Sequence, residues 1–342
     1  MGSVRWGILS TANIARVLVE ASRRVPNANF VAVASRDAPR ATAFAEQTGL
    51  PAAYDSYDAL LARDDVDAVY LPLPISMHAE WTQRALRAGK HVLCEKAFVP
   101  TAEDAAACFE VAEARGLVLA EALMWRLHPQ TALVRRLVDD GAIGALRTVR
   151  AALSISAPPG DIRRRPELGG GATLDLGTYC VSALRLFGGS PTRVYAELLD
   201  YGSTAHDVVD MRLAGTLRLS GGVLGVFDIG LDTSRRDQLE LVGSTGTIVV
   251  TDPWICSHKE ILLTQDGATR AVPVDEDGSA GLLFDGLDPY AIELERVSAA
   301  VLGERELEFG RADAVEQATV LSALLRSGRS GRPVELSSAG AA

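Results

Sequence analysis

The sequence predicts an α/β protein that begins with a doubly wound parallel sheet and continues into an α+β domain with a large open, mostly antiparallel sheet. Over roughly the first 120 residues, short apolar runs alternate with helical patterns, which is typical of βαβ units. Beyond Trp125, longer β-rich runs are separated by glycine, serine and aspartate, as in antiparallel strands joined by tight turns. We place the boundary near residue 122, which gives domains 1–122 and 123–342.

The elements of the first domain follow from apolar runs and from helix start and stop signals. One helix follows Asp37, a candidate N-cap, with Pro39 in its first turn, and two others end at Gly89 and Gly116. The expected strands are Val4–Leu9, Phe30–Ala34, Ala68–Leu71, His91–Cys94 and Val118–Ala120, and the expected helices are Asn13–Arg24, Ala38–Gln47, Ala79–Ala88 and Thr101–Arg115.

The second domain mixes helices with a series of strands. An irregular stretch, Pro158–Gly171, contains three consecutive arginines and three consecutive glycines. The expected helices are Pro129–Asp140, Thr173–Phe187, Pro289–Val301 and Arg311–Leu325, and the expected strands are Arg147–Ser156, Leu213–Leu219, Gly222–Leu231, Leu239–Val242 and Thr247–Thr251.

Composition and charge argue against several classes of function. The 342 residues carry a net charge of −10, which disfavours a nucleic-acid partner because a phosphate backbone requires a basic surface. No apolar run reaches the roughly 18 residues of a membrane span and no signal peptide precedes the first strand, so we expect no membrane partner and a cytoplasmic location. The four cysteines are widely spaced without zinc-ligand spacing, so we expect no metal site.

The turn after the first strand is a candidate dinucleotide site. The usual fingerprint is GxGxxG between a strand and a helix, and its three glycine positions here are Ser10, Ala12 and Ala15. Small residues still let the backbone approach a pyrophosphate, whose charge is favoured at a helix N-terminus. An ordinary strand–helix turn is the alternative. The expected cofactor-binding residues of this turn are Ser10, Thr11, Ala12, Asn13 and Ile14.

The end of the second strand indicates which dinucleotide is bound. An NAD enzyme usually has an acid there for the ribose hydroxyls, whereas this chain has Ser35 and Arg36. A guanidinium can pair with a 2′-phosphate and stack on adenine. We therefore expect NADP(H), with NAD(H) possible because Asp37 lies next in the chain. A surface arginine beside a helix cap is the alternative.

Three residues form a candidate reacting centre. Lys96 follows the strand that ends at Cys94, and Asp175 and Tyr179 lie four residues apart in an expected helix. A tyrosine is a poor base at neutral pH, and a nearby ammonium lowers its pKa, so Lys96 could activate Tyr179 or act as the acid/base itself. Asp175 could orient the lysine or bind a substrate hydroxyl. Each residue alone has a structural alternative: a surface pair, a helix cap or a core aromatic.

Five stretches of the chain match a known family when taken together. They are Trp6–Ala15, Tyr70–Pro74 with His78, Ala88–Lys96, Met124–Gln130 and Gly169–Tyr179. With these stretches the chain resembles the glucose–fructose oxidoreductase/inositol dehydrogenase (Gfo/Idh/MocA) family. The tyrosine at 179 is similar to the branch that includes dimeric dihydrodiol dehydrogenase and D-xylose dehydrogenase. The family usually has proline after the lysine, and here Ala97 follows.

The resemblance implies a Rossmann domain, an α+β domain whose open sheet forms a homodimer or homotetramer interface, NAD(P) and a polyol or sugar substrate. It also implies Lys96 as the essential lysine, Asp175 as its partner on the substrate side and Tyr179 as the proton donor or acceptor.

Further candidates lie near these motifs. Cofactor contacts are also expected from residues at the carboxyl ends of strands in the first domain, namely Leu71, Pro72, His78, Glu95 and Lys96. A structural role at a helix start is the alternative for His78. The expected substrate-binding residues are Lys96, Arg126, Arg163, Asp175 and Tyr179; the loop that holds Arg163 could be a lid or simply a solvated loop.

The sequence therefore predicts an NADP-dependent oxidoreductase that acts on a secondary alcohol, ketone or anomeric carbon of a sugar or cyclic diol, such as D-xylose or a trans-dihydrodiol. One alternative is a nucleotide-linked deoxysugar 3-ketoreductase, which would need basic contacts to a diphosphate. Another is a non-catalytic NADP-binding regulatory protein.

Overall fold

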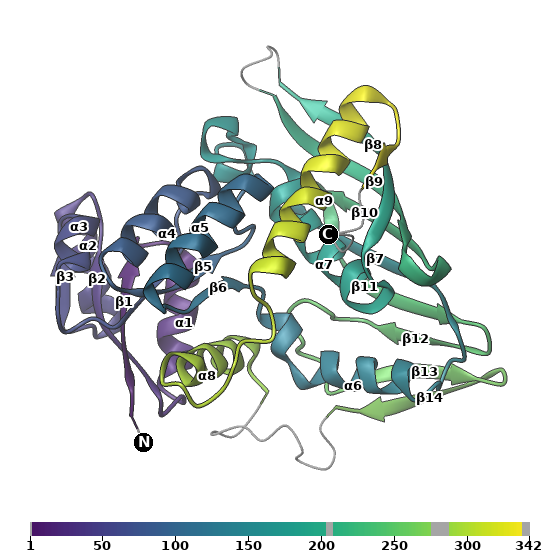
Figure 1. Cartoon of the computed structure of the whole chain (residues 1–342), viewed down its shortest axis with the longest axis horizontal. Coiled ribbons are helices and arrows are strands. Elements are labelled where there is room, and N and C mark those ends of the chain that lie inside the picture. The colour runs from purple at the N-terminus through teal and green to yellow at the C-terminus, as the bar shows by residue number, and fades with distance from the viewer. Residues whose placement is uncertain (1, 203–207, 275–286, 337–342) are drawn as a thin grey trace. The chain divides into compact units, whose positions relative to one another are not determined.

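The computed structural model describes residues 2–202, 208–274 and 287–336 (Figure 1). Contacts divide the chain into two compact units: Met1–Leu127 with Gly281–Val315, and His128–Ala280 with Glu316–Ala342. The sequence placed the boundary at residue 122 and both C-terminal helices in the second domain. Helix α8 (Pro289–Val301) instead groups with the first unit, because its apolar face joins the core around β1 (Val4–Leu9).

The first unit contains a six-stranded sheet in the order β3-β2-β1-β4-β5-β6, with every neighbouring pair parallel. This order reverses at β1, as the doubly wound prediction requires. Strand β3 was not predicted, because three residues give too short a pattern to recognise. The remaining strands are β2 (Ala28–Ala34), β3 (Ala52–Tyr54), β4 (Ala68–Leu71), β5 (His91–Glu95) and β6 (Leu119–Ala122).

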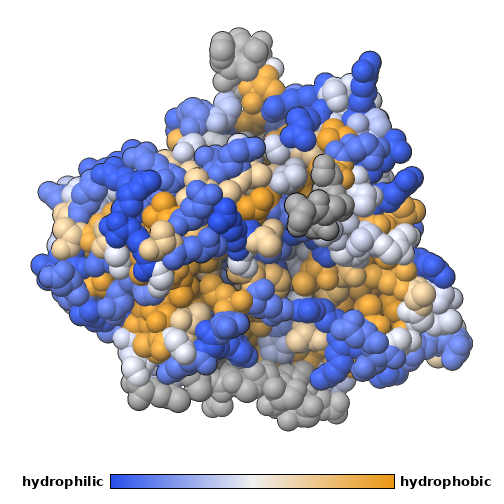
Figure 2. Space-filling view, viewed as in Figure 1, coloured by the Kyte–Doolittle hydropathy of each residue, from blue (hydrophilic) through white to orange (hydrophobic). Residues whose placement is uncertain are grey.

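Helices α2 (Ala38–Thr48) and α5 (Ala102–Arg115) begin at capping residues that precede them in the sequence, whereas the short helix α3 (Tyr57–Leu61) was not predicted. Asp37 accepts a hydrogen bond from Arg40 N at the start of α2, and Thr101 does the same for Asp104 N at the start of α5. Helices α4 and α5 present a mostly hydrophilic outer surface in Figure 2, as expected for helices with one face on a core. The helices are α1 (Asn13–Ser22), α2 (Ala38–Thr48), α3 (Tyr57–Leu61), α4 (His78–Arg87) and α5 (Ala102–Arg115).

The second unit contains a nine-stranded sheet in the order β14-β13-β12-β11-β7-β10-β9-β8-β15. Only β7 and β10 pair in parallel among its described strands, so the mostly antiparallel prediction is confirmed. The strands are β7 (Leu146–Ser156), β8 (Pro191–Tyr201), β9 (Val209–Leu219), β10 (Leu224–Gly230), β11 (Asp232–Gly243), β12 (Gly246–Val250), β13 (Glu260–Gln265), β14 (Ala268–Pro273) and β15 (Val334–Glu335).

One face of this sheet is covered by helix and the other is exposed. Along β9, Leu213 and Leu217 are buried while Arg212 and Thr216 are exposed, which is the alternation of a sheet packed on one side. Helix α7 (Thr178–Gly188) packs on β7 and β10. Two further helices are α6 (Pro129–Asp139) and α9 (Arg311–Ser330). Within the described ranges, no helix is both long and apolar enough to span a bilayer.

The turn from β1 to α1 has serine where the dinucleotide fingerprint has its first glycine. Ser10 has φ 137°, a conformation that glycine adopts easily and that is strained for a residue with a Cβ. Its Oγ accepts a hydrogen bond of 3.0 Å from Ala12 N. The N-cap of α1 is Ala12, which has no side-chain acceptor, so the backbone amides of the first turn of α1 suit an anion.

Substitution of Ser10 can separate the strain from the hydrogen bond. S10A keeps the strain and loses the bond, whereas S10G loses both. We expect S10G to have a free energy of unfolding about 1–2 kcal/mol above that of S10A, because a strained non-glycine conformation costs about 1–3 kcal/mol and the entropy of an unfolded glycine offsets part of the gain. Urea denaturation of both variants measures the difference, and equal stabilities would show that Ser10 is not strained.

Candidate active site

The carboxyl end of β2 places a cation where the sequence predicts the 2′-phosphate contact. Arg36 is exposed, and Ser35 is buried with its Oγ accepting from Asp37 N at 3.2 Å. The Asp37 carboxylate accepts the amide of Arg40 at 3.1 Å and so caps α2. Asp37, the acid that could accept ribose hydroxyls, therefore already bonds the amide of Arg40. Arg36 lies just before it in the chain, just beyond the end of β2.

His78 starts α4 and is fully buried. Its Nδ1 lies 2.9 Å from the carbonyl oxygens of both Ala97 and Phe98, and its Nε2 lies 2.8 Å from that of Leu73. Burial lowers the pKa of His78, although the three carbonyls act in the opposite direction. The ring thus joins the loop after β4 to the loop after β5, which favours the structural alternative for this residue; a cofactor contact stays a prediction.

Lys96 follows β5 directly, at the carboxyl edge of the parallel sheet. The peptide bond between Lys96 and Ala97 is cis. The preceding Glu95 accepts a 2.5 Å hydrogen bond from the Tyr70 hydroxyl, and its other oxygen accepts from Lys96 N at 3.3 Å. Burial and then the Glu95 carboxylate raise the pKa of Tyr70 well above its usual value, so Tyr70 serves as a donor that holds Glu95.

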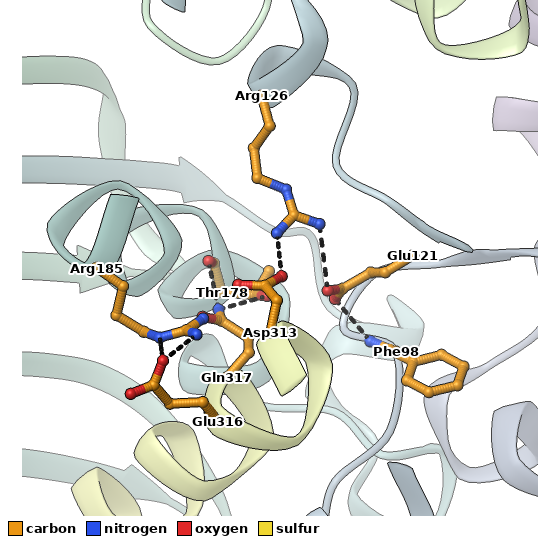
Figure 3. Close-up of polar contacts among 8 residues, drawn as sticks. All are labelled: Phe98, Glu121, Arg126, Thr178, Arg185, Asp313, Glu316 and Gln317. Atoms are coloured by element: carbon orange, nitrogen blue, oxygen red, sulfur yellow. Dashed lines mark hydrogen bonds and ion pairs between the residues drawn. The ribbon is translucent and has the colours of Figure 1, made fainter. Parts of the chain in front are cut away.

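Arg126 lies in a buried polar cluster of the first unit (Figure 3). Its guanidinium is 2.5 Å from an oxygen of Asp313 and 3.7 Å from one of Glu121, and it stacks 4.1 Å from the centre of the Phe309 ring. Glu121 also accepts the amide of Phe98, at 2.9 Å. The Arg126 side chain is only 3% exposed and is linked through Glu121 to Phe98, in the loop after Lys96; a direct substrate contact stays a prediction.

Asp175 and Tyr179 lie in the second unit, where the sequence predicts one continuous α-helix from 173 to 187. The structure has a π-helical turn over Thr173–Gly177, followed by α7. Such single turns widen the backbone locally and occur often at functional sites. Tyr179 is half-buried, with its ring 5.7 Å from that of Trp254 in an edge contact. Trp254 is fixed in turn because its Nε1 donates to Ala152 O at 3.2 Å.

The arginine loop of the second unit has internal partners. Arg163 Nε donates to Asp175 at 2.7 Å, and the same guanidinium pairs with Asp161 at 3.2 Å. Burial lowers the pKa of Arg163, but the two carboxylates raise it above its ordinary value. Arg164 donates to Ala157 O, and Arg165 pairs with Glu167 at the surface. The loop thus brings a cation to Asp175.

Helix α9 bonds α7 at Thr178 and Arg185 through residues that the sequence did not single out (Figure 3). Gln317 Nε2 donates to the carbonyl oxygen of Thr178 at 2.8 Å, and its Oε1 accepts from Arg185 at 2.7 Å. Arg185 also pairs with Glu316 at 2.5 Å. In the sequence, Gln317 is only a polar residue among the apolar residues of a helix face. Its role cannot be inferred from this until the partner helix is known.

Lys96 belongs to the first unit, and Asp175 and Tyr179 belong to the second. Convergence of the three side chains therefore stays a prediction. Within the described residues, no group of three or more histidine, cysteine, aspartate or glutamate side chains could hold a metal ion.

Comparisons with known proteins match both halves of the chain. The model of the oxidoreductase family with an NAD-binding Rossmann fold matches residues 4–123, and that of the GFO/IDH/MocA C-terminal domain matches residues 131–249. D-xylose 1-dehydrogenase (NADP(+)) 2 of Haloferax volcanii is 36% identical over 97% of this chain and 99% of its own. The dTDP-3,4-didehydro-2,6-dideoxy-α-D-glucose 3-reductase of Actinomadura kijaniata is 36% identical over 95% of this chain and 96% of its own.

A solved structure agrees with these matches. KijD10, a 3-ketoreductase from Actinomadura kijaniata in complex with NADP and TDP-benzene, superposes with a TM-score of 0.84 at 32% identity, covering 95% of this chain and 98% of that one. Since both halves match their family models and relatives match along nearly their whole length, the chain belongs to the GFO/IDH/MocA family of oxidoreductases.

Proposed function

We propose that the protein is an NADP(H)-dependent oxidoreductase that moves a hydride between nicotinamide and a secondary alcohol, ketone or anomeric carbon of a sugar or cyclic diol. The observation that carries this proposal is the position of Lys96 at the carboxyl edge of a Rossmann sheet in a chain that matches NADP-dependent sugar enzymes over nearly its whole length. D-xylose and a trans-dihydrodiol are the candidate substrates.

The first unit fits NADP at two places. The uncapped first turn of α1 suits a pyrophosphate, and Arg36 suits a 2′-phosphate because Asp37 already caps α2. When bound, the nicotinamide supplies the hydride acceptor or donor. The protein's own residues then have to bind the substrate and move one proton on or off its oxygen.

We assign that proton to Tyr179 and Lys96. Tyr179 presents its phenol from the first turn of α7, with its ring held against Trp254. The Lys96 ammonium lowers the pKa of a phenol that it approaches, so the tyrosine can accept the proton during oxidation and return it during reduction. Asp175 orients the substrate through a hydroxyl, and Arg163 Nε donates a 2.7 Å hydrogen bond to this carboxylate.

A nucleotide-linked keto sugar is the second candidate substrate, because a relative that matches over nearly its whole length is a dTDP-sugar 3-reductase. It would need cations for a diphosphate. The three arginines of the loop already have partners in Asp175, the Ala157 carbonyl and Glu167, which favours a free sugar or diol. A non-catalytic NADP-binding protein would have no need of an arginine-paired Asp175 close to Tyr179 in the chain.

The first test of the proposed function is removal of the proton-handling groups. We expect K96A and Y179F each to lower kcat by about 10²-fold or more, the size of lost acid–base catalysis. Initial rates are followed by NADPH absorbance on D-xylose and a trans-dihydrodiol in the oxidative direction, and on a dTDP-linked keto sugar in the reductive direction. The preferred substrate identifies which candidate is correct.

The matched controls for this test are K259A, which removes an ammonium from an exposed position, and Y195F, which removes a hydroxyl from a half-buried tyrosine of β8; both should leave the rates unchanged. Wild-type kcat in both K96A and Y179F would refute the assignment. Tight NADPH binding without turnover on any substrate of the panel would favour the regulatory alternative.

The cofactor assignment is tested at Arg36. We expect R36A to raise the KM for NADP+ by about 10-fold or more while the KM for NAD+ changes by less than about threefold, because an ion-paired hydrogen bond contributes about 1.5–3 kcal/mol. R40A removes an exposed arginine from the neighbouring helix and serves as the control. An equal rise of both KM values would show that Arg36 does not read the 2′-phosphate.

We also propose that the open face of the nine-stranded sheet pairs with a second copy of the chain. Leu199 on β8 and Leu224 and Val226 on β10 are exposed by 57%, 54% and 38%. The strand register places all three on the same face as the exposed Arg212 and Thr216 of β9. Exposed apolar side chains gathered on one surface are typical of an interface between proteins.

The double variant L224E/V226E is expected to shift the protein from dimer, or tetramer, to smaller species in light scattering coupled to size-exclusion chromatography, because buried unpaired carboxylates oppose association. V17E places one such carboxylate at an exposed valine of α1 and should not change the mass. A monomeric wild type, or an unchanged mass in the double variant, would contradict this interface.

A further inference from the structure

The turn that leads into α7 is capped by a residue from a distant strand. Ala172 precedes the π-helical turn and offers no side-chain cap. Asp210, on β9 and only 4% exposed, supplies one: its Oδ2 accepts both the amide and the hydroxyl of Thr173, each at 2.6 Å. Two short bonds to one carboxylate oxygen hold the start of the turn against the sheet.

Gly171 shows how closely this carboxylate is packed. A Cβ at this position would lie 2.1 Å from Asp210 Oδ1, and Gly171 also has φ +125°, so a glycine is required on both grounds. The carbonyl oxygen of Gly171 accepts the amide of Asp175 at 3.1 Å, and its amide donates to Arg163 O at 2.9 Å. Asp210 therefore packs against Gly171, whose backbone bonds the backbone of both Asp175 and its partner Arg163.

We propose that Asp210 is a positioning residue for the reaction: from β9 it fixes the segment 171–179 and so sets where Asp175 and Tyr179 lie. The proposal deepens the proposed function and rests on it, because it assigns a role to Asp210 through the two residues that would contact substrate.

Burying the Asp210 carboxylate costs free energy, so its presence at this position indicates a specific role. Burial raises the pKa of Asp210 to about 6, and Asp200, its register partner on β8, adds a like charge that acts in the same direction. Bonds from Thr173 oppose the shift. An apolar residue would fill the same place without the cost of desolvating a charge. What the carboxylate adds is the pair of bonds to Thr173, two residues before Asp175.

The experiment compares D210A and D210N at pH 8, where Asp210 is ionised in the wild type. D210A removes both acceptors, and we expect kcat to fall by about 10-fold or more while the KM for NADP+ changes by less than twofold. D210N keeps a neutral oxygen for Thr173, so we expect at least a threefold recovery of kcat over D210A. A merely structural acid would lower the amount of folded enzyme without this split between kcat and KM.

Hydrogen exchange gives a readout that does not depend on turnover. We expect amides of the peptide 171–179 to exchange about 10-fold faster in D210A, with those of β1 unchanged. T173V and T173S serve as milder variants if D210A folds poorly: T173V should show a smaller fall in kcat, and T173S should match the wild type. S327A removes another buried hydroxyl of the second unit, which bonds Ala196 N and Arg332 O, and should change neither readout.

Unchanged exchange in D210A would overturn the capping role, and faster exchange with wild-type kcat would overturn the positioning role. Failure of the proposed function is distinguishable, because it would show as a wild-type rate in Y179F. In that case the exchange data still decide whether Asp210 caps the turn, while its role in positioning a catalytic group falls.

Discussion

A polar group removed from water needs a partner inside the protein, and this constraint fixes the segments that carry the candidate site. In the first unit, His78 and Glu121 bond the backbone on either side of Phe98, in the loop that follows Lys96. In the second, Asp210 and Gln317 bond the two ends of the turn that contains Asp175. None of these four side chains is expected to touch substrate. Each instead bonds the backbone close in sequence to a residue of the candidate site.

The fold was largely predictable because it rests on local patterns. Apolar runs followed by capped helices define the strands of the first unit, and Asp37, Thr101 and Gly116 mark helix ends where the structure has them. Errors occur where a pattern is short or where tertiary packing decides. Strand β3 is too short to recognise, and α8 groups with the first unit through contacts to a core that is distant in sequence.

The candidate site was predictable only in its chemistry-bearing residues. Lys96, Asp175 and Tyr179 could be named from residue type and position, but Asp210 and Gln317 could not, since an aspartate in a strand and a glutamine in a helix have no signal without their partners. The π-helical turn at 173–177 was also missed, because a four-residue spacing predicts an ordinary α-helix. Arg126 illustrates the converse: its motif was visible, but its two carboxylate partners were not.

The pair formed by Asp175 and Arg163 shows how a site can be both ordered and ready to bind. The Asp175 side chain is 11% exposed and that of Arg163 is 38% exposed, so water screens part of their attraction. Because Asp175 is buried, losing the Arg163 bond without a new donor would be costly, whereas a substrate hydroxyl that replaces one bond keeps the carboxylate paired. Because Asp210 and Gln317 hold the backbone of the turn, Asp175 can exchange partners without moving. Rigid support with a partner that a substrate hydroxyl can replace is the arrangement expected of a carboxylate that orients a polyol.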